Sequence, residues 1–261
     1  MPHELNLNAD LGESFGAWSM GRDQELLPLV GSANIACGFH AGDPLVMRKT
    51  VRAALDNGVS LGAHPAFPDL QGFGRRKMVI PAPELEAMVI YQLGALAGMA
   101  RAEGGTLTHV KPHGALNNMA CEDIALARAV VRAVRQFDAE LILLAPALSH
   151  LADAGKETGL RVALEVFADR AYDEAGNLAP RSQPGAVLHD PRDCVAHVQR
   201  MIEAGGLITT SGKVLPTPFH SICVHGDNAE AVEAAAAIRH ALESRGHPIK
   251  PLPHLSALTR T

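Results

Sequence analysis

The sequence of 261 residues lacks the features that support disulfide-based, membrane or nucleic-acid functions. Its four cysteines stand far apart and form no paired-cysteine motif, which is typical of a reduced cytoplasmic protein. No apolar run approaches the length of a membrane span, and the first residues do not resemble a signal peptide. Lysine and arginine are scattered and the net charge is −5, which indicates no binding to nucleic acid or an anionic membrane. We therefore expect a cytoplasmic protein that acts on a small molecule.

Two further absences concern domain organisation and nucleotide binding. The chain has no Ser/Gly/Pro-rich linker and no shift in composition along its length, which predicts a single domain over 1–261. Gly212-Lys213 is similar to the end of a phosphate-binding P-loop, but Val214 follows where Ser or Thr is needed, and Leu207 replaces the first glycine. Nucleotide binding through such a loop is therefore not expected.

Apolar runs alternate with amphipathic helical segments along the chain. Asp43-Pro44 opens one such helix, which ends at Asn57-Gly58. This alternation predicts a parallel sheet, and about seven strands in this length favour an α/β barrel over a doubly wound sheet. A turn at 211–213 predicts a hairpin insertion over 207–217. Strands are expected over 5–8, 32–37, 59–63, 106–110, 141–145, 161–167 and 221–224, helices over 22–30, 43–57, 83–102, 122–137, 147–156, 191–204 and 229–244, and long loops at 64–81 and 168–190.

Ionisable residues follow many of these strands at the point where each strand ends. His40, for example, comes soon after the apolar run 33–37, and a helix begins directly afterwards. A parallel barrel brings the carboxyl ends of its strands to one mouth, so these side chains are expected to share a pocket. The candidate catalytic residues are Asp10, His40, His64, Lys111, His113 and His225.

Asp10, His40 and His64 follow three consecutive strands and form a possible metal-binding set. A carboxylate and two imidazoles suit Zn²⁺, Mn²⁺ or Co²⁺. The sequence has no His-Glu-x-x-His helix and no closely spaced ligand pair, so a hydrogen-bonded polar pocket without metal is the alternative. Both interpretations remain open at this point.

Other charged residues near the strand ends are candidates for binding substrate. Lys111 can neutralise an oxyanion, but it can also be a structural partner of Asp10 or Glu165 inside the barrel. Arg170 can bind a carboxylate through two hydrogen bonds, and the arginines at 75–76 can bind an anion or lie on a solvated face. The candidate substrate-binding residues are Glu13, Glu165, Asp169, Arg170 and Asp227.

Six motifs, in order along the chain, resemble those of the LamB/YcsF family. They are NADLGESFG from Asn8, NIACGFHAGDP from Asn34, GAHPAFPDLQGFGRR from Gly62, VKPHGALN from Val110, EVFADRAY from Glu165 and ICVHGDN from Ile222. The resemblance extends over almost the whole chain. It implies a distorted (β/α)7 barrel, similar to the barrels of the glycoside hydrolase/deacetylase superfamily.

The resemblance also implies an activity. Members of this family act in the ATP-dependent opening of the 5-oxoproline lactam to L-glutamate, together with subunits B and C of the same enzyme. ATP is then a co-substrate of the complex, and the substrate chemistry calls for a base, cations and an acid. The expected base is Asp10 or His40, the cations are Lys111 and Arg170, and the acid is His64, His113 or His225.

Two other functions remain open on the sequence alone. One is a metal-dependent carbohydrate or amide deacetylase that works alone, and the other is a non-catalytic regulatory subunit. The chain also departs from the family pattern, because Asn117 stands where Tyr is usual and Ala175-Gly176 stands where Asp-Gly is usual. A role for a tyrosine hydroxyl at position 117 is therefore not expected here.

Overall fold

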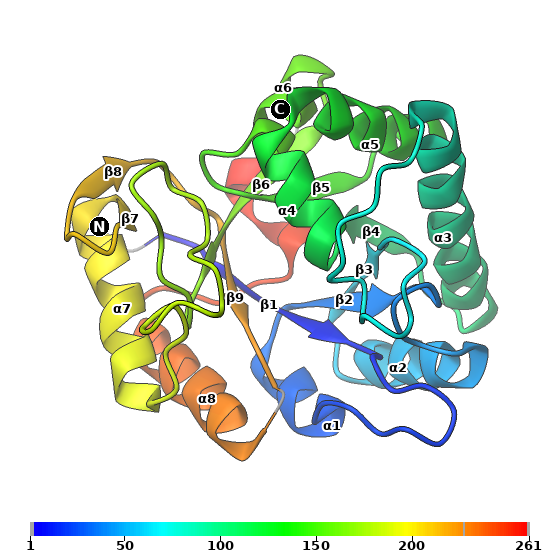
Figure 1. Ribbon diagram of the computed structural model, residues 1–261. Helices are drawn as coiled ribbons and strands as arrows, with labels where there is room; N and C mark the ends of the chain where they lie inside the picture. The colour runs from blue at the N-terminus through cyan, green and yellow to red at the C-terminus, as the bar shows by residue number, and fades with distance from the viewer. Residues whose placement is uncertain (1–2, 227, 260–261) are drawn as a thin grey trace.

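Seven parallel strands close into a barrel in the computed structural model, which describes residues 3–226 and 228–259 (Figure 1). The strand order is β1-β2-β3-β4-β5-β6-β9, with β9 pairing with both β1 and β6, and this confirms the expected α/β barrel. A separate antiparallel pair, β7 with β8, lies at the hairpin segment. The strands are β1 (Asn6–Leu11), β2 (Ser32–Ala36), β3 (Ser60–His64), β4 (Leu107–Val110), β5 (Ile142–Pro146), β6 (Arg161–Phe167), β7 (Gly206–Ile208), β8 (Val214–Pro216) and β9 (Ser221–Val224).

The helices surround the barrel, as Figure 1 shows. Apolar residues on their inner faces pack against the outward side chains of the strands and form the main core. None of the helices in the described part of the chain has the length and apolar character needed to cross a bilayer. The helices are α1 (Asp23–Leu26), α2 (Pro44–Asp56), α3 (Ala82–Ala102), α4 (Gly114–Glu122), α5 (Ile124–Phe137), α6 (His150–Glu157), α7 (Pro191–Ala204) and α8 (Ala229–Ser244).

Helix α4 was not predicted from the sequence. Asn117 and Asn118 lie in its middle, and asparagine has low helix propensity, so the local sequence signal is weak. The helix forms because Ala115, Leu116 and Ala120 are buried in the core. Tertiary packing therefore outweighs propensity in this segment.

A cap and a proline explain two shifted helix boundaries. The helix expected from residue 147 begins at His150, because the Ser149 hydroxyl accepts a hydrogen bond from the Ala152 amide at 3.1 Å. The helix expected over 22–30 is instead the short α1 followed by a 3₁₀ turn at Leu27–Leu29, where Pro28 cannot donate a backbone hydrogen bond. Neither shift changes the order of the elements.

The inside of the barrel is largely polar, with Ile142 and Leu144 of β5 as aliphatic exceptions. Alternate residues of β1 show this arrangement, because Leu7 and Leu11 belong to the core outside the barrel, while Asn6 and Asn8 bond to side chains of other strands. At the amino-terminal end, the segment after α8 covers the barrel with Leu252, Leu255 and Leu258, which cluster with apolar side chains of β5 and β6. This cover closes the end of the barrel opposite the strand ends that carry the candidate residues.

Leu252 is completely buried in this terminal cover. The substitution Leu252→Ala is expected to lower the free energy of unfolding by roughly 2 to 5 kcal/mol, because it leaves a cavity against the barrel strands. Urea denaturation measures the change. The control Val79→Ala, at a residue that is 97% exposed, is expected to change stability by less than about 0.5 kcal/mol. Equal effects of the two substitutions would show that the cover does not stabilise the barrel.

Candidate active site

A cavity of about 270 Å³ opens at the mouth of the barrel. Residues from both long loops, 65–81 and 168–190, contribute to its wall. Five of the six candidate catalytic residues line it, and the sixth, His40, lies behind His113, with the two rings stacked at 3.8 Å between centroids. The structure thus brings the predicted strand-end residues together. The five lining residues are Asp10, His64, Lys111, His113 and His225.

Lys111 forms the floor of this cavity between two carboxylates. Its Nζ lies 3.1 Å from Asp10 Oδ1 and 2.9 Å from Glu165 Oε1. It also lies 3.2 Å from Asn8 Oδ1 and 3.2 Å from Cys223 Sγ. The three N–H bonds of the ammonium are therefore directed at groups of the protein, which favours the structural role for Lys111.

Burial and neighbouring charges shift the pKa values of Lys111, Asp10 and Glu165. Burial lowers the pKa of Lys111, but Asp10, Cys223 and Glu165 outweigh burial and hold this pKa well above its ordinary value. Burial raises the pKa of Asp10, but His64 and Lys111 hold it well below its ordinary value. For Glu165, burial dominates and raises the pKa. Asp10 is therefore ionised at neutral pH.

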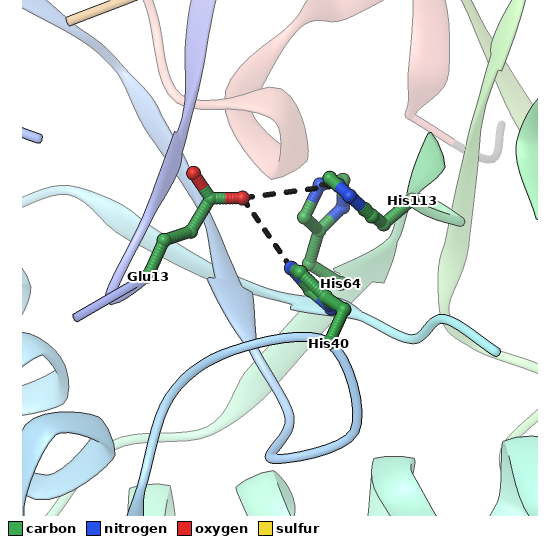
Figure 2. A group of neighbouring side chains, drawn as sticks. All are labelled: Glu13, His40, His64 and His113. Atoms are coloured by element: carbon green, nitrogen blue, oxygen red, sulfur yellow. Dashed lines mark hydrogen bonds and ion pairs between the residues drawn. The ribbon is translucent and has the colours of Figure 1, made fainter. Parts of the chain in front are cut away.

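A carboxylate and three imidazoles form a second cluster (Figure 2), and one of these imidazoles, His64, contacts Asp10. Glu13 Oε1 lies 3.3 Å from His40 Nε2 and 3.8 Å from His113 Nδ1. Each of these residues and His64 can place one ligand atom within 4.8 Å of the others. Asp10 is not in this set, although its Oδ2 lies 3.2 Å from His64 Nε2. The set therefore differs from the predicted Asp10, His40 and His64 by having Glu13 and His113 in place of Asp10.

Backbone carbonyls fix the tautomers of two of these histidines. His64 Nδ1 lies 2.6 Å from the Lys111 carbonyl oxygen, and His113 Nε2 lies 2.8 Å from the Phe73 carbonyl oxygen. A carbonyl only accepts, so both nitrogens donate, and in neutral rings the lone pairs are on His64 Nε2 and His113 Nδ1. These two atoms face each other at 3.0 Å, so a proton or a metal ion is needed between them. Together with the Glu13 carboxylate, they fit a divalent transition metal.

Asp169 and His225 form a hydrogen-bonded pair on another side of the mouth. Asp169 Oδ2 lies 2.7 Å from His225 Nδ1. Burial raises the pKa of Asp169, but the adjacent imidazole and neighbouring arginines outweigh burial and hold this pKa below its ordinary value. His225 and Arg181 also border a second cavity of about 420 Å³, between the 168–190 loop, α7 and α8. An ionised Asp169 therefore orients the His225 ring at the junction of the two cavities.

The remaining predicted substrate-binding residues have different surroundings. Glu165 is 1% exposed and lies in the barrel interior. This matches the alternative prediction that Glu165 and Lys111 are structural partners inside the barrel. Arg170 lines the cavity, but its Nη2 donates to the Ala179 carbonyl at 2.7 Å and so holds the 168–190 loop. Asp227 lies outside the described residues. Substrate contacts of these residues stay predictions.

Sequence reasoning missed several interior residues of the site. Asn8 donates to Glu165 Oε1 at 2.8 Å, and Asn34 donates to Asp10 Oδ1 at 2.9 Å. Asn8 could have been predicted from the sequence, because Asn6, Asn8 and Asp10 alternate and therefore lie on one face of the strand. Cys223 had no such signal, because its run reads as an ordinary apolar strand.

Comparison with known proteins places this arrangement in a family. The family model described as LamB/YcsF family matches residues 5–257. The chain belongs to the LamB/YcsF family. Two curated relatives of this LamB/YcsF chain are each named as the A subunit of 5-oxoprolinase. The relative from Azoarcus sp. (strain BH72) is 66% identical, with 97% of this chain and 98% of the relative covered, and the one from Methylococcus capsulatus is 53% identical, with 97% of each covered.

Solved structures agree with the family assignment. The lactam utilization protein from Thermus thermophilus has a TM-score of 0.90 and 44% identity, and the match covers 95% of this chain and 100% of that one. The Bc1960 peptidoglycan N-acetylglucosamine deacetylase has a TM-score of 0.53 and 12% identity, with 99% of this chain and 90% of that one covered. The second likeness shows that the LamB/YcsF chain shares its barrel fold with a deacetylase.

The histidine cluster generates a metal-binding prediction. Titration of the purified LamB/YcsF chain with Co²⁺ is expected to give visible absorption bands from coordination by His64, His113 and Glu13. The substitution His113→Ala is expected to abolish them, because it removes one of the two facing lone pairs. The control His240→Ala, at an exposed residue of α8, should retain them. Identical spectra for His113→Ala and the wild-type chain would contradict the assigned ligands.

The Lys111 cluster generates a stability prediction. The substitution Lys111→Met leaves two buried carboxylates without their shared cation, so the free energy of unfolding is expected to fall by about 3 to 5 kcal/mol at neutral pH. The loss should shrink as the pH is lowered, because Glu165 has a raised pKa and becomes protonated. Urea denaturation of Lys111→Met, with the exposed-site control Lys49→Met, measures both effects. A Lys111→Met protein as stable as its control would refute the role of Lys111 as the floor of the site.

Proposed function

We propose that this chain is the component of an ATP-dependent 5-oxoprolinase (EC 3.5.2.9) in which the lactam ring is opened. The reaction cleaves 5-oxo-L-proline to L-glutamate, coupled to ATP hydrolysis, and the chain acts with subunits B and C. The names of the curated relatives and of the Thermus thermophilus protein support a role in lactam hydrolysis. The chemistry of the cavity at the barrel mouth supports the same reaction.

The observation that carries the proposal is a carboxylate and an imidazole that lie close together in the lining of one cavity. A carboxylate oxygen of Asp10 and a ring nitrogen of His225 lie within 4.8 Å of each other. A small lactam beside them can contact both groups, which is the geometry that amide hydrolysis needs. The volume of about 270 Å³ suits a small substrate of this kind.

In this proposal Asp10 acts as the base and His225 as the acid. Asp10 accepts a proton from water as the water oxygen bonds to the lactam carbon. The ring carbon–nitrogen bond then breaks, and His225 donates a proton to the leaving nitrogen. Asp10 is preferred to His40 because the His40 side chain is completely buried behind His113. His225 is preferred to the other histidines because Asp169 orients it.

Binding and activation of the substrate involve charges at the rim of the cavity. Arg75 and Arg181 line the cavity together with Arg170, and a guanidinium group matches the carboxylate of 5-oxoproline. ATP supplies a phosphoryl group that activates the lactam oxygen, which makes the stable amide easier to hydrolyse. Ring opening by the first water molecule leaves this phosphoryl group on the new carboxyl group, and a second water molecule then cleaves the acyl phosphate to glutamate and inorganic phosphate. The sequence has no P-loop, so we place ATP binding with the partner subunits.

A metal-dependent carbohydrate or amide deacetylase that acts alone is the second candidate. The specific observation in its favour is the fit of Glu13, His64 and His113 to a divalent metal. A bound metal would polarise an amide oxygen or lower the pKa of a water molecule. Metal-dependent deacetylation by the isolated chain would favour this candidate, and a regulatory subunit would show neither activity nor sensitivity to changes in the cavity.

The assembled enzyme provides the test of the proposed function. Asp10→Asn and Asp169→Asn are expected to lower kcat for glutamate formation by about 10² to 10⁴-fold, because one removes the base and the other the group that orients the acid. Asp56→Asn, at an exposed residue at the end of α2, is the matched control and should retain wild-type turnover. The measurement is 5-oxoproline-dependent release of glutamate and phosphate.

Omission of subunits B and C separates the candidate functions. The isolated chain is expected to release no glutamate with ATP and 5-oxoproline, whereas the complete mixture is expected to do so. Wild-type turnover in both Asp10→Asn and Asp169→Asn would rule out the assigned chemistry. Steady ATP-dependent glutamate formation by the isolated chain would rule out the requirement for partners.

A further inference from the structure

A row of residues at one level of the barrel links Asp10 to a histidine three strands away. Asp10 on β1 pairs in register with Asn34 on β2, Asn34 with Gly62 on β3, and Gly62 with His109 on β4. Gly62 has no side chain, and the His109 ring occupies the space that a side chain there would fill, because a Cβ on Gly62 would overlap the ring. His109 therefore reaches across β3 and contacts Asn34 directly.

The carboxylate of Asp10 and its neighbour Asn8 fix the orientation of the Asn34 amide. Asn34 Nδ2 lies 2.9 Å from Asp10 Oδ1 and 2.7 Å from Asn8 Oδ1, and both oxygens are acceptors. A flipped amide would place the Asn34 oxygen against these two oxygens, which is unfavourable. The Asn34 Oδ1 atom therefore points in the other direction, toward His109.

The tautomer of His109 follows from this orientation. His109 Nε2 lies 3.1 Å from Asn34 Oδ1, so Nε2 carries the proton and donates. Burial, with smaller effects from Lys111 and His64, lowers the pKa of His109 to about 3, so the ring is neutral and Nδ1 accepts. Thr108 Oγ1 lies 2.8 Å from Nδ1 and 2.9 Å from the Leu61 carbonyl oxygen, so its one hydroxyl hydrogen is available to either acceptor. The Asn34 amide and His109 Nε2 therefore each have an assigned donor or acceptor role.

We propose that His109 and Gly62 are positioning residues, which hold Asn34 so that Asn34 orients the Asp10 carboxylate toward the reacting water. This inference rests on the proposed function, in which Asp10 is the base. His109 has an exposed fraction of 0%, so it acts through Asn34 and touches no substrate. Groups that hold a reacting residue in this way typically affect turnover by about 10- to 100-fold when they are removed.

Kinetics of the assembled enzyme test the proposal. His109→Leu removes the donor to Asn34, and Gly62→Ala displaces the ring, so each is expected to lower kcat by about 10- to 100-fold with little change in KM. His109→Gln keeps an amide donor and is expected to recover much of the lost kcat. Gly98→Ala on α3, where an added Cβ meets no atom within 4 Å, is the control and should match the wild type. Wild-type kcat in folded His109→Leu and Gly62→Ala would overturn the inference.

Crystal structures of His109→Leu and His109→Gln provide a readout that does not depend on activity. The Leu variant is expected to lose the Asn34 Nδ2 to Asp10 Oδ1 contact, and the Gln variant to retain it. An unchanged Asp10 carboxylate in the Leu variant would overturn the proposal. A wild-type complex that fails to cleave 5-oxoproline would instead refute the proposed function, and the two structures would still decide whether His109 orients Asp10. If the Leu variant does not fold, Gly62→Ala is crystallised in its place, with the same two outcomes.

Discussion

The buried ammonium of Lys111 holds two carboxylates from different strands at the centre of the barrel mouth. Asp10 and Glu165 would repel each other in this low-dielectric interior without a cation between them, and each would favour its neutral form. With His64 and Lys111 beside it, the pKa of Asp10 stays well below its ordinary value. A buried ion pair is weak evidence for stability, so we interpret this cluster chiefly as a device that keeps one carboxylate ionised and fixed in direction.

The rest of the site is arranged around this fixed charge. Below it, the barrel contains amides and hydroxyls where many barrels contain aliphatic layers, and these groups supply the hydrogen bonds that a buried charge requires. Beside it, the Glu13 and histidine cluster provides a place for a proton or a metal ion. Above it, the two long loops supply arginines and Asp169, and Asp169 bonds to His225, which follows β9.

Much of the fold and part of the site could be predicted from the sequence, for physical reasons. Asp10, His64 and His113 follow apolar runs, and parallel strands bring such positions to one edge, so their convergence follows from topology. Asp10 and Glu165 were predicted as alternative partners of Lys111. The sequence could not show that Lys111 contacts both of them as well as Asn8 and Cys223, because this depends on the register of strands that are distant in the sequence. The same limit applies to Glu13, which lies after β1 and contacts His40. It also applies to α4, because its asparagines have low helix propensity and tertiary packing stabilises the helix.

The central claim is that the lactam is opened between Asp10 and His225 above the Lys111 cluster. A crystal structure of the assembled enzyme with 5-oxoproline bound tests this claim most directly. We predict that the lactam carbonyl carbon and ring nitrogen lie in the cavity of about 270 Å³, with the carbon on the side of Asp10 and the nitrogen within hydrogen-bond distance of His225. A 5-oxoproline molecule bound instead in the cavity between α7 and α8, or on one of the partner proteins far from Asp10, would contradict it.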